Sequence, residues 1–183
     1  MIGIRTRPPR FNHKRGESVG ATLGETLETM RPIIRDAKST DIQQIVAIER
    51  VSFDQPWSAE SFVHELSLPF SRTIVALTQD GPGAELIGYL CRWLVADECH
   101  ILSLAVAPRF RRAGIGAILM GEALAEASRK RAAIITLEVR RSNLAARSLY
   151  RKLNFAERRV RKNYYGPGED AIIMERRMER PEH

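Results

Sequence analysis

Glu138 and Tyr150 are the two side chains whose types and positions best suit proton transfer. Glu138 lies in the apolar run 133–139, which predicts a strand, and a carboxylate in such a run faces either solvent or a cleft. Strand alternation places it opposite Leu137 and Val139. Tyr150 lies on the next predicted helix, where its phenol could donate a proton. An exposed glutamate and a core aromatic ring are the alternatives, and the pattern alone leaves them open.

A loop with two glycines precedes another predicted helix and suits an anion. Arg111 and Arg112 begin the loop, and Gly114 and Gly116 end it before the helix expected over residues 117–131. The first amides of a helix lack carbonyl partners and lie at the positive end of its dipole, so they attract phosphate. Arginine can add two hydrogen bonds to a phosphate. A plain left-handed turn with solvated arginines is the alternative.

Several familiar site types do not fit the sequence. A Walker loop requires Gly-Lys-Ser/Thr, which is missing, and a dinucleotide fingerprint requires a third glycine where Gly121 is misplaced. No metal site is expected, because the histidines are scattered without ligand spacing. They are His13, His64, His100 and His183. Cys91 and Cys99 form no ligand pattern and are expected to be small buried residues.

The elements that must position these residues alternate between strands and helices. Strands are expected over residues 33–35, 73–77, 86–95, 101–106, 133–139, 155–162 and 171–177, and helices after residues 40 and 58 and over 117–131 and 143–153. Thr40 and Ser58 are the expected N-caps, and Phe62, Val63 and Leu66 are the expected buried stripe behind Ser58. The order predicts a single α/β domain with a mixed, mostly antiparallel central sheet flanked by helices.

Composition restricts the class of protein. The chain has 183 residues, of which 44% are hydrophobic and 28% charged, as expected for one globular domain. No apolar run approaches the roughly 20 residues of a membrane-spanning helix, and none follows the basic N-terminus as in a secretory signal. Residues 1–31 are expected to be a flexible extension, 32–178 the domain and 179–183 a tail. Two cysteines and no export signal predict a cytoplasmic protein.

The net charge of +7 is distributed unevenly. Residues 1–31 carry +3, residues 32–108 carry −5 and residues 109–183 carry +9. A basic C-terminal half suits a polyanionic partner, such as a nucleic acid, a membrane surface or a phosphorylated cofactor. A solvated basic face without a partner is the alternative. The acidic stretch could favour a cationic substrate such as an amine.

The loop and the strand before it resemble the signature of the GCN5-related N-acetyltransferase (GNAT) superfamily. That signature is Arg/Gln-x-x-Gly-x-Gly/Ala after a strand ending in Val-x-Pro. This sequence matches it in register with Val106, Pro108, Arg111, Gly114 and Gly116. The resemblance covers residues 32 to about 178 and implies a GNAT-like fold with acetyl-CoA as cosubstrate and no metal.

The resemblance also implies which residues bind the coenzyme. The loop over residues 111–116 would bind its pyrophosphate, and the backbone of residues 104–106 would bind the acetyl and pantetheine part. The implied contacts are Leu104, Ala105, Val106, Arg111, Arg112, Ala113, Gly114, Ile115, Gly116, Asn143 and Tyr150.

A longer set of stretches resembles the RimI-type branch, the bacterial ribosomal-protein alanine N-acetyltransferases. The matching residues are 137–140, 143, 146, 149–150 and 153–155, with 56–58, 163–165 and 169–172. By this resemblance Glu138 is the proton acceptor, directly or through water, and Tyr150 is the proton donor. Asn154 departs from the glycine usual in the branch, but asparagine also tolerates the left-handed conformation.

The same resemblance indicates where an acceptor would bind. The loop with Tyr164 and Tyr165 and the segment with Phe53 and Trp57 would flank a peptide N-terminus. A narrow pocket there would favour a small first residue such as alanine. The alternative for Tyr164 is that it only covers the edge of the sheet.

The implied activity is acetyl transfer to a protein α-amine by direct attack in a ternary complex. The implied acceptor is the N-terminal alanine of protein eighteen of the small ribosomal subunit, with neither a membrane nor direct nucleic-acid binding required. An α-amine has a pKa of about 7.7–8.0, against about 10.4 for lysine, so a modest base suffices. Another protein N-terminus, a lysine or a small amine is the first alternative. A non-enzymatic RNA-binding module that uses the basic half is a remote one.

Overall fold

The computed structural model describes residues 31–178. Apart from Arg31, the extension expected over residues 1–31 and the tail expected at 179–183 lie outside the described residues. Seven strands form one sheet in the order β1-β2-β3-β4-β5-β7-β6. Each neighbouring pair is antiparallel except β4 and β5, which run parallel. The mixed, mostly antiparallel sheet predicted from the sequence is therefore confirmed.

The elements follow the predicted order, with shifts of a few residues at their ends. The strands are β1 Ile33–Asp36, β2 Ser71–Leu77, β3 Leu86–Val95, β4 Glu98–Val106, β5 Ile134–Arg140, β6 Ala156–Arg161 and β7 Ala171–Arg177. The helices are α2 Ile42–Ser52, α3 Ala59–Ser67, α4 Ile115–Arg129 and α5 Leu144–Lys152, with short 3-10 turns at Ser39–Asp41 and Pro108–Phe110.

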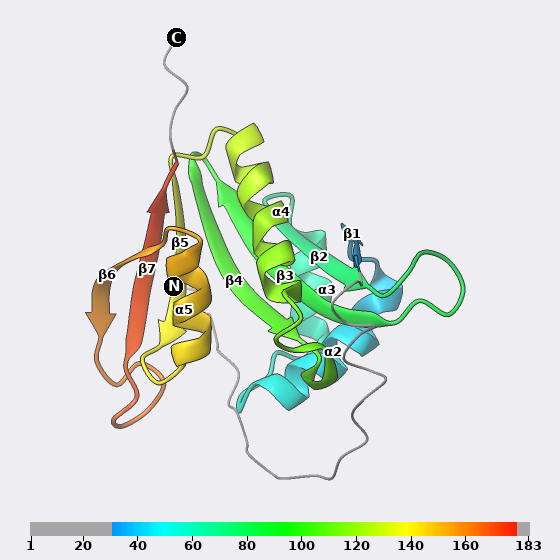
Figure 1. Cartoon of the computed structure of the whole chain (residues 1–183), viewed down its shortest axis with the longest axis horizontal. Coiled ribbons are helices and arrows are strands. Elements are labelled where there is room, and N and C mark those ends of the chain that lie inside the picture. The colour runs from blue at the N-terminus through cyan, green and yellow to red at the C-terminus, as the bar shows by residue number, and fades with distance from the viewer. Residues whose placement is uncertain (1–30, 179–183) are drawn as a thin grey trace.

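Helices cover both faces of the sheet (Figure 1). The helices α4 and α5 lie on one face, and α2 and α3 lie on the other. A core lies on each face of the sheet, and alternate residues of β2 pack into one or the other, because successive side chains of a strand point to opposite faces. Ile74 and Ala76 join the core beneath α4, whereas Val75 and Leu77 join the core beneath α2. This arrangement explains why β2 and β3 are apolar on both faces.

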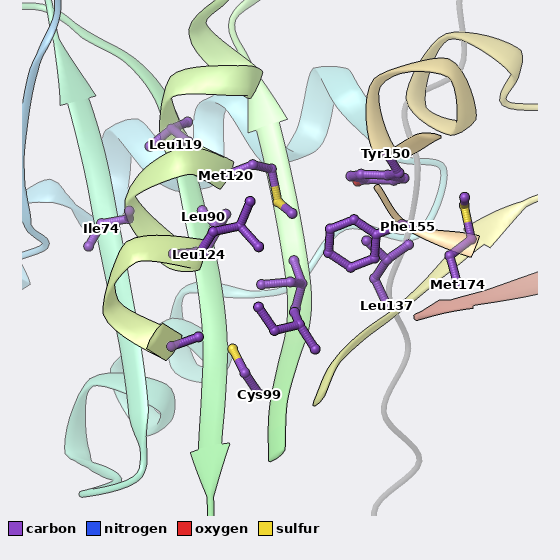
Figure 2. Close-up of a cluster of buried hydrophobic side chains, with 14 of the residues drawn as sticks. Ile74, Leu90, Cys99, Leu119, Met120, Leu124, Leu137, Tyr150, Phe155 and Met174 are labelled. Carbon is purple, nitrogen blue, oxygen red and sulfur yellow. The ribbon is translucent and has the colours of Figure 1, made fainter. Parts of the chain in front are cut away.

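Helix α4 lies close to the sheet and places its first turn beside β3 and β4. Leu119 and Leu124 of α4 pack over Leu90 (Figure 2). A Cβ atom on Gly88 of β3 would lie 3.3 Å from a methyl carbon of Leu119 and 3.4 Å from one of Ile115. The absence of a side chain at Gly88 therefore lets the start of α4 approach the strand.

Two local predictions need correction. Thr40 is not the N-cap of α2, because it lies in the preceding 3-10 turn and the cap position is Asp41. The Asp41 carboxylate accepts a hydrogen bond from the amide of Lys38 at 2.7 Å, which fixes the turn. Val63 is 54% exposed and does not belong to the buried stripe, since it lies about 100° around the helix from Phe62. The predicted N-cap Ser58 is confirmed: its hydroxyl accepts a hydrogen bond from the amide of residue 61 at 3.2 Å.

The parallel strands β4 and β5 pair over only part of their length. Their register ends at Ile101 and Leu137. Beyond that point β4 stays paired with β3 to Val106, while β5 stays paired with β7 to Arg140. A register shift between β3 and β4 leaves Leu102 as an extra residue where pairing with β5 stops, as in a β-bulge. The two strands consequently diverge toward their carboxyl ends (Figure 1).

Candidate active site

A cleft of about 690 Å³ opens where β4 and β5 diverge. Its walls come from the second half of β4, the first turn of α4, the end of β5 and one side of α5. All coenzyme contacts expected from the sequence line this cleft, with the exception of Ala113. Glu138 lines it as well. The fold thus brings the predicted coenzyme residues and both predicted proton-transfer residues to one cleft.

The first turn of α4 presents backbone amides to the cleft. Gly114 is the N-cap and has a φ of +79°, a left-handed conformation that glycine adopts without strain. The amide of Ile118 donates to the Gly114 carbonyl at 3.1 Å, so the amides of Ile115, Gly116 and Ala117 precede the first bonded turn. Within the described part of the chain, no side chain caps this helix. The site therefore suits a phosphate group, which can accept from several amides at once.

The two arginines of this loop have different positions. Arg111 donates from Nε to the Val106 carbonyl and from Nη2 to the Ser52 hydroxyl, both at 3.0 Å. Burial lowers the pKa of its guanidinium. The side chain thus links the end of β4 to α2 by hydrogen bonds. Its main contribution to the cleft is to fix the position of the loop over residues 111–116. Arg112 is exposed and has a φ of +69°, so its charge lies at the mouth of the cleft.

Asn143 combines a structural role with an available donor. Its Oδ1 caps α5 by accepting from the amide of Ala146 at 3.0 Å. Its Nδ2 is buried and has no hydrogen-bond partner within residues 31–178. A side-chain amide can donate two hydrogen bonds, and an unpaired buried donor is costly without a ligand. Because Asn143 lines the cleft, this donor is available to a ligand bound there.

Glu138 has the features of a catalytic base. Its side chain is 10% exposed, and Oε1 lies 2.7 Å from Nη1 of Arg161. Its Oε2 is buried and lacks a hydrogen-bond partner among the described residues. Burial raises the pKa of the Glu138 carboxyl above its usual value, and this outweighs the opposing effects of Arg161 and of a hydrogen bond with Tyr164. One carboxylate oxygen is therefore held in place while the other remains able to accept a proton.

Tyr150 is buried against the core at the inner end of the cleft. Its ring lies 6.0 Å from that of Phe155, and both lie beside Leu137 (Figure 2). Burial raises the pKa of the Tyr150 phenol, so the hydroxyl stays protonated at neutral pH. A protonated phenol that lines the cleft is able to donate a proton or a hydrogen bond to a leaving group.

The four predicted acceptor residues do not line the cleft itself. Tyr164 and Tyr165 are half-buried, and their rings meet edge to face at 5.1 Å. Trp57 is also half-buried, and its amide donates to Oε1 of Glu49 at 2.9 Å. Phe53 is only 5% exposed and belongs to the core beneath α2, so its role is in packing.

Two arginines that the sequence analysis missed connect these parts. Arg161 of β6 pairs with Glu138 and lies 5.4 Å from the ring centre of Tyr164. Arg140, at the end of β5, lies 4.5 Å from the ring centre of Tyr165. Neither contact joins sequence neighbours, and both depend on the strand order β5-β7-β6. No local signal in the sequence could have revealed them.

The remaining candidate chemistries find no support in the described residues. No group of three or more His, Cys, Asp or Glu side chains between residues 31 and 178 could hold a metal ion. Cys91 and Cys99 are buried away from the cleft, and burial raises the pKa of their thiols to about 12 and about 11. None of the described helices is long and apolar enough to cross a membrane.

Comparison with known families agrees with this geometry. Residues 42–155 match the Acetyltransferase (GNAT) family, and the chain belongs to that family. GNAT acetyltransferases use acetyl-CoA. The family resemblance expected from the loop residues is thereby confirmed.

Individual members of the family show which enzymes this chain is similar to. A Bacillus subtilis protein provisionally named [ribosomal protein bS18]-alanine N-acetyltransferase is 38% identical over 143 residues, covering 77% of this chain and 92% of that protein. The Escherichia coli K12 protein named [ribosomal protein bS18]-alanine N-acetyltransferase is 35% identical over 147 residues, covering 77% and 94%. The crystal structure of the E. coli ribosomal-protein-S18-alanine N-acetyltransferase superposes with a TM-score of 0.74 at 30% identity, covering 84% and 97%. The chain is thus similar to these enzymes over nearly their whole length.

Proposed function

We propose that this chain transfers the acetyl group of acetyl-CoA to the N-terminal α-amine of a protein, with the N-terminal alanine of ribosomal protein bS18 as the acceptor. The observation that carries the proposal is the Glu138 carboxylate at the cleft between β4 and β5, one oxygen of which has no hydrogen-bond partner in the part of the chain that the structure describes. The names of the B. subtilis and E. coli relatives support the choice of acceptor.

The residues of the cleft suit acetyl-CoA as the donor. The first amides of α4 and the exposed Arg112 offer positive charge to a pyrophosphate. Beyond Ile101, the edge of β4 that faces β5 has no partner among the described strands, so its backbone is available to the pantetheine amides. Asn143 supplies one further donor from Nδ2. The hydrogen-bond donors in this set suit the phosphates of the ligand. The open strand edge suits its amide groups.

The chemistry assigned to the chain is direct transfer within a ternary complex. Glu138 accepts the proton of the α-amine, the nitrogen forms a bond to the thioester carbonyl carbon, and the carbon–sulfur bond breaks. Tyr150 donates a proton to the departing thiolate. The raised pKa of Glu138 makes this carboxylate a stronger base than an exposed glutamate. Neither cysteine lies at the cleft, so a thiol of this chain is not positioned to form an acetyl-enzyme.

The test compares two forms of one peptide. The first begins with a free alanine and contains an internal lysine, and the second has the same sequence with its α-amine blocked. Incubation with the purified chain and acetyl-CoA, followed by site-resolved mass spectrometry, should show acetylation of the free α-amine and none of the lysine. Equal reaction of the blocked peptide through its lysine would overturn the proposal.

A further inference from the structure

Three buried polar atoms that find no hydrogen-bond partner among residues 31–178 belong to the last residues of β5 and the segment that follows it. They are Oε2 of Glu138, Nε of Arg140 and Nδ2 of Asn143. Among the described residues, the other such side-chain atom is the hydroxyl of Thr73, which lies in β2. Buried polar groups are normally hydrogen-bonded, so unpaired groups beside a candidate site indicate contacts made by a ligand. Glu138 and Asn143 line the cleft, whereas Arg140 lies between them in the chain and does not line it. The proposed function uses the atoms of Glu138 and Asn143 but leaves that of Arg140 unexplained.

The guanidinium of Arg140 is held in a fixed orientation. Its side chain is 9% exposed, and Nη2 lies 3.5 Å from a carboxylate oxygen of Asp54. On its flat face, the central carbon lies 4.5 Å from the ring centre of Tyr165. Contacts with a carboxylate and with an aromatic ring together restrain both the position and the plane of the group. The Nε–H donor is therefore preorganised, and none of the described residues supplies an acceptor for it.

Arg140 also lies between the two segments assigned to the acceptor. Asp54 belongs to the connection between α2 and α3, which includes Trp57. Tyr165 belongs to the loop between β6 and β7. Arg140 is two residues after Glu138 on β5, so the two side chains leave the strand on the same face, separated by about 7 Å along it. A ligand that reaches Glu138 from these segments thus passes beside Arg140.

We infer that Arg140 binds the acceptor, with its Nε–H donating a hydrogen bond to the backbone carbonyl oxygen of the acceptor's first residue. The inference rests on the proposed function and adds a basis for its specificity. Arginine has donors only, so the partner must be an acceptor atom. In a protein N-terminus, the carbonyl oxygen follows the α-amine by one carbon. In a lysine side chain, the ε-amine is separated from any carbonyl by the whole aliphatic stem, so Arg140 favours the α-amine.

The test uses two acceptors that differ in this carbonyl. One is an alanine-starting peptide, and the other is the same peptide with its first carbonyl reduced to a methylene group. The wild-type chain should acetylate the normal peptide with a kcat/KM about 10 to 100-fold higher, since a hydrogen bond to a charged group is lost with the carbonyl. Reduction of the carbonyl also raises the pKa of the neighbouring amine, which affects wild type and variant alike. In Arg140→Lys, which keeps the charge but lacks Nε, the preference should therefore be smaller than in wild type by about tenfold or more. The KM for acetyl-CoA should not change.

A matched control is available on β3. Arg92 is also a buried arginine, with a side chain 5% exposed, but it pairs with Glu126 of α4, whereas Arg140 contacts Asp54 and Tyr165 in the two acceptor segments. Arg92→Lys should therefore keep the wild-type preference between the two peptides. The inference is overturned if the wild-type chain uses both peptides equally, or if Arg140→Lys slows both by the same factor. The first of these comparisons needs no variant, so it holds even if Arg140→Lys does not fold. Failure of the proposed function would look different, because the wild-type chain would then acetylate neither peptide.

Discussion

At the scale of single residues, Glu138 has one carboxylate oxygen restrained by Arg161 and another that has no hydrogen-bond partner between residues 31 and 178. We predict that Glu138→Gln lowers kcat by about 10²–10⁴-fold, the usual contribution of general base catalysis. The dissociation constant for acetyl-CoA should stay near the wild-type value, because glutamine has almost the same shape. Stopped-time assays with the alanine peptide and direct coenzyme titration measure the two quantities. Near-normal turnover between pH 6 and 9 would remove Glu138 from the mechanism.

Arg161 contributes to the pKa of Glu138, the proposed base. Its positive charge lowers the pKa of Glu138, while burial raises it and has the larger effect. Removing the charge in Arg161→Gln should raise the pKa of Glu138 further. Since the base must be deprotonated to act, the acid limb of kcat should move to higher pH.

A control for this shift lies on the same strand. Arg158 of β6 lies 3.7 Å from Glu175 rather than near Glu138, so Arg158→Gln should leave the pH profile of kcat unchanged. Identical acid limbs in wild type and Arg161→Gln would show that the ion pair does not tune the base.

At the scale of elements, the first turn of α4 forms a wall of the cleft in which side-chain size matters. A Cβ atom on Gly116 would lie 3.4 Å from a methyl carbon of Leu149 on α5, across the cleft. We predict that Gly116→Val raises the KM for acetyl-CoA by about tenfold or more, as expected where added carbons overfill a packed site. Steady-state kinetics at saturating peptide measure this change.

Gly121 provides the comparison for that variant. It lies further along α4 and has no neighbouring atom within 4 Å of an added Cβ. Gly121→Val therefore introduces the same residue into the same helix away from the cleft, and its KM should match wild type. A KM raised equally in both variants would mean that a general effect on α4, and not the narrowing of the cleft, is responsible.

Most of these elements could be predicted because local sequence determines them. Ser58 caps α3 through its own hydroxyl, and Gly114 begins α4 in a conformation that favours glycine. The start of α2 was predicted wrongly at Thr40 because Asp41 forms its hydrogen bonds with Arg35 and Lys38, one of them in β1. Contacts that depend on the folded chain thus moved the boundary by one residue.

At the scale of the whole molecule, a buried hydrogen-bond network joins the acceptor side to the cleft. The Tyr89 hydroxyl bonds to the carboxylate of Glu49 and lies 2.8 Å from the hydroxyl of Ser103, which lines the cleft. Burial and the charge of Glu49 raise the pKa of Tyr89 well above its usual value. The network links α2, β3 and β4 through groups that are almost entirely buried.

We predict that Tyr89→Phe lowers the free energy of unfolding by about 1–3 kcal/mol, because it leaves buried polar groups without a partner. For a chain of this size, the melting temperature should fall by about 2–4 °C for each kcal/mol. Ile74→Ala, a core truncation on the opposite face of β2, should also destabilise the fold but should not disturb the network. Unchanged melting of Tyr89→Phe beside a destabilised Ile74→Ala would show that the network contributes nothing to stability.

The charge of the C-terminal half has a structural explanation that the sequence alone could not provide. Arg147 and Arg151 both pair with Glu157, and Arg141 pairs with Asp170. The first two pairs join α5 to the neighbouring strand β6, and the third joins residues 29 positions apart, from the residue after β5 to the residue before β7. Part of the basic excess therefore holds this half of the sheet together, while Arg112 remains at the mouth of the cleft. A polyanionic partner is not required to explain all of the charge.

Calorimetric titration of the purified chain with acetyl-CoA tests most directly whether the divergence of β4 and β5 forms the donor site. We expect saturable binding with one site per chain. Glu138→Gln should bind with similar affinity, because that residue acts after binding. An absence of saturable heat for the wild-type chain, under conditions in which it is folded, would contradict the assignment of the cleft and the acetyl transfer that depends on it.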